Sequence, residues 1–209
     1  MCIALMNIEL FTAFLLITVV LIVVPGPVVT LVITTSVSHG TRAGLMAVLG
    51  TATGTSAVLA AIALGLNWVL ANAAGAFEVL RWGGVAYLIW LGIQAWRTAG
   101  QEGVVLAPCG RVHFVRGLFV ALTNPKTIAF FTAFLPQFID PALPLASQLL
   151  AMCVASVLIA LIADSCWAIA AGMGRAFFMQ PSRAKLLGRL SGTVLIGGGI
   201  WLSLARRPA

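Results

Sequence analysis

The sequence predicts an all-α polytopic membrane protein in which six transmembrane helices form two inverted three-helix repeats, with helices one and four broken at proline. Of the 209 residues, 61% are hydrophobic and only 8% are charged, whereas soluble domains carry about 25% charged residues. Apolar segments of about 20 residues, the length that crosses a bilayer, recur about six times. Proline breaks also stand at matching places in the two halves of the chain.

One integral membrane domain, residues 1–209, is expected to account for the whole chain, because the apolar segments leave no room for a soluble domain. The first segment is expected to stay in the protein, since it lacks the basic start and the small-residue cleavage site of a signal peptide. Either Met1 or Met6 is the start of translation.

The net charge of +7 does not indicate a nucleic-acid partner, because the basic residues fall in alternate loops. The four cysteines form no CxxC pair, which favours neither a zinc site nor a redox centre. The sequence therefore predicts no metal site and no cofactor. It also offers no nucleophile paired with a base, so an enzyme is not expected.

The first predicted helix is interrupted by Pro25-Gly26-Pro27. Pro25 and Pro27 remove the amide hydrogens that would bind the carbonyls of Leu21 and Val23 in an unbroken helix. A carbonyl without a partner costs several kcal/mol in hydrocarbon, so such a break survives only beside protein or a water-filled cavity. We therefore expect this break to form the wall of a binding site.

The remainder of the first repeat, which covers about residues 8–97, is predicted from the same apolar pattern. Its three helices are expected to span 10–37, 43–66 and 76–96. The second helix carries Gly50 and Gly54 as a GxxxG pair, a small-residue face against which another helix packs closely. The expected partner is a helix of the same chain, and a homodimer contact is the other interpretation.

The second repeat covers about residues 114–205 and follows a polar loop at about 98–113. Its helices are expected to span 114–138, 145–171 and 190–204. The first of them is broken at Asn124-Pro125-Lys126, where Asn124 is predicted to cap a new half-helix that has Pro125 at its first position. Gly26-Pro27 indicates the same arrangement in the first repeat. Both half-helix N-termini then point at the membrane centre with free amides, which suit a carboxylate.

The odd number of helices in each repeat inverts the second repeat relative to the first. Matched broken helices in two inverted repeats are the best sequence pointer to the substrate site of a transporter. Basic residues gather on one side of this arrangement, which predicts that this side is cytoplasmic and that both termini lie outside. They are Arg42, Arg97, Arg111, Arg116, Arg175, Arg183, Lys185 and Arg189, while the other side carries Arg206 and Arg207.

Lys126 and Asp164 are charged residues near the middle of their spans, where each costs about 2.5–3.5 kcal/mol to insert. We expect both to face one cavity, with Asp164 binding the ammonium group of an amino acid or a coupling proton. The carbonyls freed at the breaks, those of Leu21, Val23 and Ala121, are expected to accept hydrogen bonds from the same ammonium group. A mutually neutralising structural pair of Lys126 and Asp164 is the alternative interpretation.

Thr30 and Thr34 lie one turn apart on the face of Pro27 and are expected either to line the cavity or to bond backbone carbonyls of their own helix. His39 and His113 fall in predicted loops, where solvated histidines are expected. The candidate substrate-binding residues are Pro25, Gly26, Pro27, Thr30, Asn124, Pro125, Lys126 and Asp164, and Gly50 and Gly54 are the candidates for helix packing.

Three stretches occur in order along nearly the whole chain. They are PGP at 25–27, GTRAGLMAVLGTATG at 40–54 joined to WGGVAYLIWLGIQAWR at 82–97, and LTNPKTIAFFTAFLPQFI at 122–139. This pattern resembles the LysE/RhtB family of bacterial amino-acid exporters. The resemblance implies a multi-pass protein of the bacterial inner membrane that exports amino acids or close derivatives, is driven by the proton motive force and self-associates. The family's motif residues map here onto Pro25, Gly26, Pro27, Gly50, Gly54, Asn124, Pro125, Lys126 and Asp164.

The second helix carries hydroxyl groups and no carboxylate, so little negative charge is present to meet a second positive group on a substrate. This favours neutral substrates such as homoserine, threonine or small aliphatic amino acids. Export of basic amino acids or of other small metabolites is the alternative. A metal-ion transporter of related architecture is a weaker one, because it needs several converging ligands and Asp164 is the one central carboxylate. The expected partners are an amino acid, protons, the lipid bilayer and a second copy of the chain.

Overall fold

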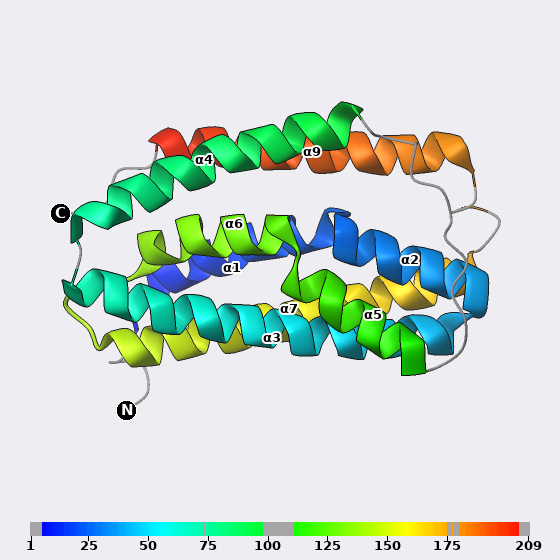
Figure 1. Ribbon diagram of the computed structural model, residues 1–209, viewed down its shortest axis with the longest axis horizontal. Coiled ribbons are helices and arrows are strands. Elements are labelled where there is room, and N and C mark those ends of the chain that lie inside the picture. Colours follow the sequence, from blue (N-terminus) through cyan, green and yellow to red (C-terminus); the bar gives the residue numbers. More distant parts are fainter. Residues whose placement is uncertain (1–5, 73, 98–110, 175–176, 178–179, 205–209) are drawn as a thin grey trace.

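The computed structural model describes residues 6–72, 74–97, 111–174, 177 and 180–204, and helices make up most of this part of the chain (Figure 1). In chain order the elements are α1 (Ile8–Val23), α2 (Pro27–His39), α3 (Thr41–Asn72), α4 (Ala74–Arg97), α5 (Arg111–Leu122), α6 (Pro125–Phe134), the 3-10 helix η2 (Leu135–Phe138), α7 (Leu145–Met173) and α9 (Pro181–Leu204). Most of the predicted loop at 98–113 lies outside the described residues, as do Arg175, Arg206 and Arg207.

The predicted proline breaks in the first and fourth helices are confirmed. α1 and α2 are bent by 46° where Val24-Pro25-Gly26 separates them, and the helices on either side of Thr123-Asn124 are bent by 43°. α7 and the Thr41–Leu66 part of α3 are long and apolar enough to cross a membrane, and each bent pair forms a further candidate span. The chain is thus an all-helical, polytopic membrane protein.

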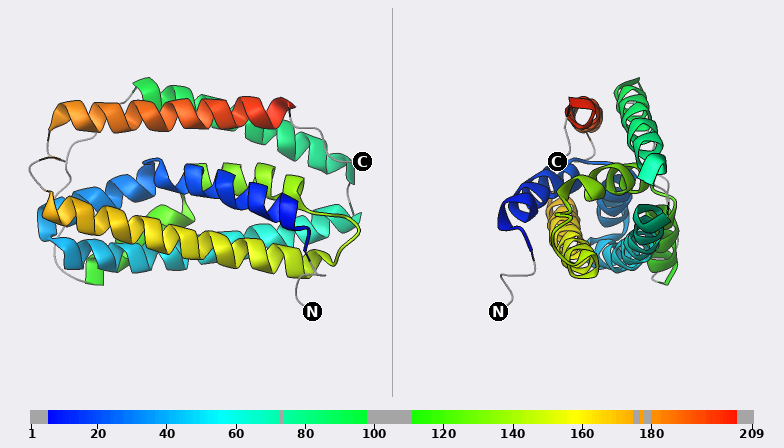
Figure 2. Two further views of the ribbon diagram at one scale, coloured as in Figure 1. Left: turned by 180° about the vertical axis from the view of Figure 1, so that it is seen from behind. Right: turned by 90° about the vertical axis from the view of Figure 1, so that its left-hand side faces the viewer.

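Two groups of helices make up the molecule. α4 and α9 lie side by side on one face, and the other helices form a bundle next to them (Figures 1 and 2). Within the bundle α3 packs against α5 and α7, and α4 is joined to the bundle mainly through α6. Glycines let α4 and α9 approach closely, because a Cβ at Gly192 would lie 2.6 Å from the carbonyl oxygen of Gly92.

An apolar groove of about 320 Å³ separates the α4–α9 pair from α1 and α6. Phe130 and Phe134 of α6 and Trp201 of α9 line it, and their rings are stacked in that order with centroids 4.2 and 5.4 Å apart. Leu21 of α1 forms part of its wall. The groove therefore brings an apolar surface up to the end of the first broken helix.

The contact between α3 and α5 depends on glycine on both helices. A Cβ at Gly50 would collide with the carbonyl group of Phe114, and one at Gly54 would lie 2.6 Å from the carbonyl oxygen of Leu118. On α5, a Cβ at Gly117 would collide with the carbonyl oxygen of Ala47. The GxxxG face of α3 is thus occupied by a helix of the same chain.

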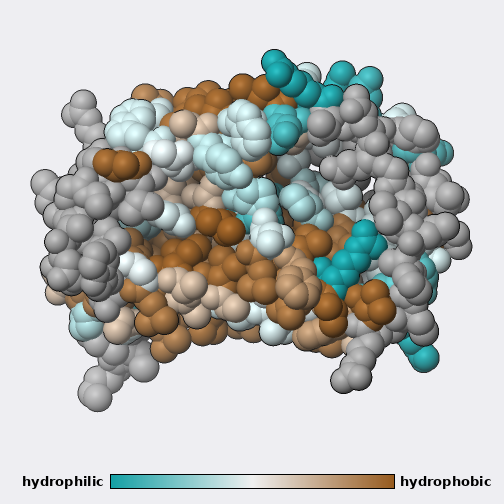
Figure 3. Space-filling model, viewed as in Figure 1, coloured by the Kyte–Doolittle hydropathy of each residue, from teal (hydrophilic) through white to brown (hydrophobic). Residues whose placement is uncertain are grey.

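Basic residues lie at one end of the molecule. Arg42, Arg97, Arg116, Lys185 and Arg189 belong to the helix ends on the right of Figure 1, where α3, α5 and α9 begin and α4 ends. Hydrophilic side chains gather at this end in Figure 3, and apolar side chains cover much of the middle. α1 begins and α9 ends at the opposite end.

α9 begins at Pro181, well before the predicted start at Leu190. Apolarity marks only the part of a helix that lies in hydrocarbon, so the charged first turns of α9 gave no apolar signal. The structure shows what holds these turns in place: the guanidinium of Arg189 lies 5.1 Å from the ring centroid of Trp96, whose Nε1 donates a hydrogen bond to Thr193 at 3.0 Å.

The prediction of a solvated His113 is wrong. His113 lies in the first turn of α5 with 2% of its surface exposed, and its ring centroid is 4.9 Å from that of His39 at the end of α2. The polar composition of the preceding segment concealed the start of α5 at Arg111. The ring contact joins the last residue of α2 to the start of α5.

At the opposite end, Asn7 ties the start of α1 to the segment before α7. Its side chain accepts hydrogen bonds from the amides of Glu9 and Leu10, and its Nδ2 donates to the carboxylate of Asp140 at 3.0 Å. The amide of Ala142 donates to the same carboxylate at 2.9 Å. These two bonds hold the pKa of the Asp140 carboxyl below its ordinary value.

The glycine contact between α3 and α5 predicts the effect of adding a methyl group. Gly50→Ala should lower the thermal unfolding temperature of the purified protein in mild detergent, because overpacking against backbone costs about 1–3 kcal/mol. Gly65→Ala is the matched control on the same helix, since a Cβ there meets nothing within 4 Å. An equal or higher unfolding temperature for Gly50→Ala would contradict the described packing.

The Asp140 contacts predict a pH dependence of stability. A carboxyl whose folded pKa lies below its unfolded value of about 3.9 contributes stability above that pH, and this contribution disappears as the pH falls through the folded pKa. The unfolding temperature should therefore decrease when the pH is lowered beneath about 4, and this decrease should be smaller in Asp140→Asn. The exposed Glu9→Gln is the control and should retain it. Identical pH profiles for Asp140→Asn and the parent protein would refute the assignment.

Candidate functional site

The first break joins two helices through extended backbone. Val24 has φ −71° and ψ 124°, and Gly26 has φ −133° and ψ −166°. Pro27 takes the first position of α2, where a missing amide hydrogen is not needed. No side chain caps this helix, so the amides of its first turn keep no side-chain partner.

The second break is capped from within. Asn124 has φ −70° and ψ 105°, and its Oδ1 accepts a hydrogen bond from the amide of Lys126 at 3.1 Å. Its Nδ2 donates to the hydroxyl of Thr127 at 2.8 Å. Pro125 stands at the first helical position of α6. The two half-helix N-termini are therefore unequal, since α6 has a side-chain cap and α2 has none.

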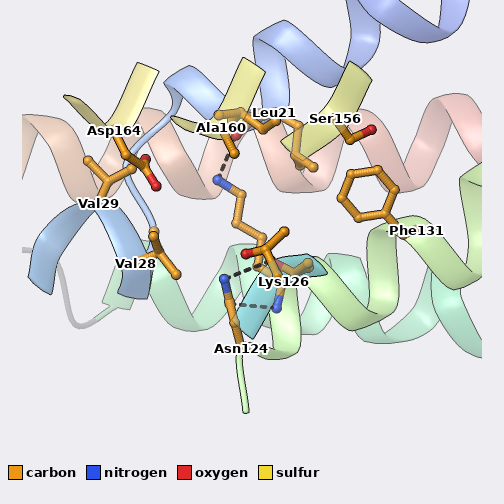
Figure 4. A pocket seen from close by; sticks show the side chains of 13 residues that line it. Leu21, Val28, Val29, Asn124, Lys126, Phe131, Ser156, Ala160 and Asp164 are labelled. Carbon is orange, nitrogen blue, oxygen red and sulfur yellow. Dashed lines mark hydrogen bonds between the residues drawn. The ribbon is translucent and has the colours of Figure 1, made fainter. Parts of the chain in front are cut away.

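Lys126 of the second break reaches across to the first (Figure 4). Its Nζ donates to the carbonyl oxygens of Leu21 at 2.8 Å and Val24 at 2.7 Å, and the side chain is 7% exposed. Hydrogen bonds to a charged donor contribute about 1.5–3 kcal/mol each. At the carbonyl of Leu21 the ammonium group thus takes the place of the amide donor that Pro25 lacks, and it joins the two breaks directly.

The other carbonyls predicted to bind substrate also have partners in the protein. Trp167 of α7 donates its Nε1 to the carbonyl of Val23 at 3.2 Å, and the amide of Asn124 donates to the carbonyl of Ala121 at 3.2 Å. The expectation of free acceptors at the breaks is therefore corrected. Lys126 and Trp167 come from distant parts of the sequence, so only the fold shows that they meet the end of α1.

Gly26 allows Lys126 to adopt this position. A Cβ at Gly26 would lie 2.9 Å from Cδ of Lys126 and 3.4 Å from its Nζ. The backbone of Gly26 is extended, a conformation that any residue adopts, so a Cβ there would act by pushing the lysine side chain aside and not through backbone strain. Glycine at this point of the PGP sequence therefore makes room for the lysine.

A cavity of about 50 Å³ lies between the two breaks and α7. Its wall is formed by Leu21, Ile22, Gly26, Val28, Val29, Thr55, Asn124, Lys126, Thr127, Phe131, Ser156, Ala160 and Asp164. A water needs about 10–15 Å³ of such space, so the cavity has room for a few waters. An amino acid requires a wider arrangement of the same walls.

Asp164 projects into this cavity from α7 and is 4% exposed. Its carboxylate interacts electrostatically with Lys126, and the hydroxyl of Thr51 of α3 donates to the carbonyl of Val48 at 2.9 Å. Among the described residues, the ammonium group of Lys126 and the carboxylate of Asp164 form no ion pair within 4.0 Å. They approach from different sides (Figure 4), which leaves the carboxylate accessible to a cation between them.

Four of the predicted substrate-binding residues share this wall: Gly26, Asn124, Lys126 and Asp164. Pro25, Pro27, Pro125 and Thr30 are not part of it. The three prolines stand at the two breaks, and Thr30 lies in the first turn of α2. The hydroxyl of Thr34 donates to the carbonyls of Thr30 and Leu31 at 2.9 and 3.1 Å. Thr34 therefore bonds backbone carbonyls of its own helix, which was one of the two expectations for this residue.

Sequence reasoning missed Thr55, Thr127, Phe131 and Ser156 in the wall. On α7 a signal was present, because Ser156 and Asp164 stand two helical turns apart and share a face with Ala160. On α6, Thr127 and Phe131 follow Lys126 but are ordinary residues of an apolar helix. Nothing in the local sequence distinguishes them from lipid-facing positions.

Comparison with known proteins gives one family. A model of the LysE type translocator family matches residues 19–206. The chain is 36% identical over 205 residues to the homoserine/homoserine lactone efflux protein of Salmonella typhimurium, which covers 96% of this chain and 99% of that protein. It is 33% identical over 207 residues to an uncharacterized membrane protein of Vibrio cholerae, and the match covers 96% of this chain and 100% of that protein.

A further relative is the leucine efflux protein of Klebsiella pneumoniae. The identity is 33% over 135 residues, which cover 62% of this chain and 63% of that protein. No solved structure matches the chain.

The contact between Gly26 and Lys126 makes a testable prediction. In Gly26→Ala the added methyl group should displace the lysine side chain from the carbonyls of Leu21 and Val24, which lowers the unfolding temperature of the detergent-solubilised protein. The loss should amount to about 1.5–3 kcal/mol for each hydrogen bond. Gly83→Ala is the control, because a Cβ there meets nothing within 4 Å. Equal stability of the two variants would contradict the described contact.

Proposed function

The chain belongs to the LysE type translocator family, and on that premise we propose that it exports neutral amino acids across the inner membrane, driven by the proton motive force. The efflux proteins of Salmonella typhimurium and Klebsiella pneumoniae are named for homoserine, homoserine lactone and leucine, all of which lack a charged side chain. The single observation that carries the proposal is the cavity between the two breaks, which holds one buried cation and one buried anion.

The proposed binding mode follows from the unequal helix ends. A substrate carboxylate binds near the uncapped first turn of α2 and the ammonium group of Lys126, where a helix N-terminus and a cation favour negative charge. The substrate ammonium group binds Asp164, which no ion pair occupies. One site then meets both charges that every amino acid carries, and it has no second carboxylate for a basic side chain.

Proton coupling is assigned to Asp164. A buried carboxylate is costly without a compensating charge, so it binds either a substrate ammonium group or a proton. Protonation weakens the attraction for the ammonium group and favours release of the amino acid. Release of the proton into the cytoplasm then restores the charged carboxylate. The proton therefore moves inward while the amino acid moves outward.

The six-span topology with two inverted repeats is part of the proposal. In support, the two breaks bend by 46° and 43°, and α1 begins at the end of the molecule where α9 ends (Figure 1). The opposite end carries the basic residues and is assigned to the cytoplasm, so both termini face outward. The resemblance also implies a homodimer, and because α5 covers the Gly50 and Gly54 face, a second copy binds elsewhere.

The proposal is tested by transport in proteoliposomes with an imposed pH gradient. The parent protein should move homoserine or another neutral amino acid against its concentration gradient. Asp164→Asn should reduce proton-driven transport by about 10- to 100-fold, as expected for the loss of one charge-assisted hydrogen bond. Glu9→Gln, an exposed carboxylate at the start of α1, should transport normally.

Both variants must be present in the membrane in equal amounts, measured by an epitope tag. Undiminished, proton-driven transport by Asp164→Asn would remove the assigned role of this residue. The absence of any amino-acid transport by the parent protein would refute the proposed function itself.

A further inference from the structure

The polar cavity between the two breaks and the apolar groove beside the α4–α9 pair share a wall. Leu21 of α1 lines both spaces and is 6% exposed. On α6, Phe131 lines the cavity and its neighbour Phe130 lines the groove, and their rings meet edge to face with centroids 5.2 Å apart. Leu21 and the two phenylalanines therefore form a thin partition between the two spaces.

The two sides of this partition have opposite chemistry. The Nζ of Lys126 lies 2.8 Å from the carbonyl oxygen of Leu21 (Figure 4), and Asp164 lines the same cavity. The part of the groove wall that the structure describes carries aliphatic and aromatic side chains and two glycines, without a charged residue. Charged groups suit the ionic head of a ligand, whereas an apolar wall suits an alkyl chain.

Glycine keeps the groove open. A Cβ at Gly197 would meet nothing within 4 Å, whereas one at Gly199 would lie 2.8 Å from Cγ1 of Ile89 on α4. Gly199 is thus required by helix packing, while Gly197, which lines the groove, leaves space that a side chain would occupy. The groove measures about 320 Å³, and since a water needs about 10–15 Å³ of such space, it has room for roughly twenty groups of that size.

We propose that the site also binds amphipathic amino acids, whose two ionic groups lie in the polar cavity and whose long unbranched alkyl side chain passes Leu21 into the apolar groove. The proposal rests on the proposed function and adds a ligand class to it. Access to the groove requires the side chain of Leu21 to turn aside.

A ligand tail suits the groove better than the acyl chain of a phospholipid does. A phospholipid keeps its charged head group at the membrane surface, whereas Lys126 and Asp164 lie within their spans, beside the groove wall and away from the helix ends. The head group and the tail of an amphipathic amino acid can therefore occupy the two neighbouring spaces together.

Amino acids of increasing chain length test the proposal. Norvaline, norleucine and 2-aminooctanoate carry unbranched side chains of three, four and six carbons, and each is added as a competitor to proteoliposomes that transport homoserine. The inhibition constant is calculated from the free aqueous concentration, so that partition into lipid is not counted. In the parent protein this constant should decrease about fourfold for each added methylene group, the gain expected from burying it.

Filling the groove should remove this dependence on chain length. Gly197→Leu places a side chain in the groove and should give nearly equal inhibition constants for the three competitors, while homoserine transport is retained. Gly197→Ala adds a smaller group and should have an intermediate effect. Gly83→Leu is the matched control, because Gly83 is exposed on α4 and a Cβ there also meets nothing within 4 Å. It should keep the dependence of the parent protein.

The outcomes separate this proposal from the proposed function. If the inhibition constants of the parent protein do not decrease with chain length, the tail does not enter the groove and the proposal is refuted, while homoserine transport upholds the exporter function. An unchanged dependence in Gly197→Leu would place the tail elsewhere and overturn the assignment to the groove. Thermal stabilisation of the protein in nanodiscs by the same compounds is measured alongside, so that the dependence on chain length is obtained even if no transport is found.

Discussion

The fold depends on one charged group that completes a broken helix. Pro25 and Pro27 take amide donors away from the carbonyls of Leu21 and Val23 at the end of α1. The ammonium group of Lys126 provides replacement donors from the other half of the chain, and Trp167 provides another from α7. The carbonyls left without amide donors in the first half are thus bonded by Lys126 and Trp167 of the second half, and the lysine holds the two breaks together beside the cavity.

The sequence was informative wherever the cause of a feature was local. Proline lacks an amide hydrogen in any surroundings, so the breaks at Pro25 and Pro125 could be located, and the cost of an intramembrane charge pointed to Lys126 and Asp164. Features that depend on distant contacts could not be derived. The partners of the Leu21 and Val23 carbonyls lie more than a hundred positions along the chain. The starts of α9 and of α5, which contains the buried His113, were missed because the first turns of both helices are polar and carry no apolar pattern.

The two breaks occupy matching places and yet differ in chemistry. Asn124 caps α6 and leaves little room for an anion there, whereas Gly26 leaves the first turn of α2 without a side-chain cap and leaves space for Lys126. The two breaks therefore present different chemistry to the cavity, as the proposed binding of a ligand with one positive and one negative group requires. In the proposed function, ligand binding depends on the residues that differ between the two breaks, and the similar bends of the two helix pairs supply the framework.

Leu21 belongs to two environments at once. Its carbonyl oxygen holds the ammonium group of Lys126, and its side chain is shared by the wall of the polar cavity and the wall of the apolar groove beside the α4–α9 pair. Leu21 therefore forms part of the boundary between the polar cavity and the apolar groove. A substitution at Leu21 would consequently alter both spaces at once, because this residue belongs to both walls.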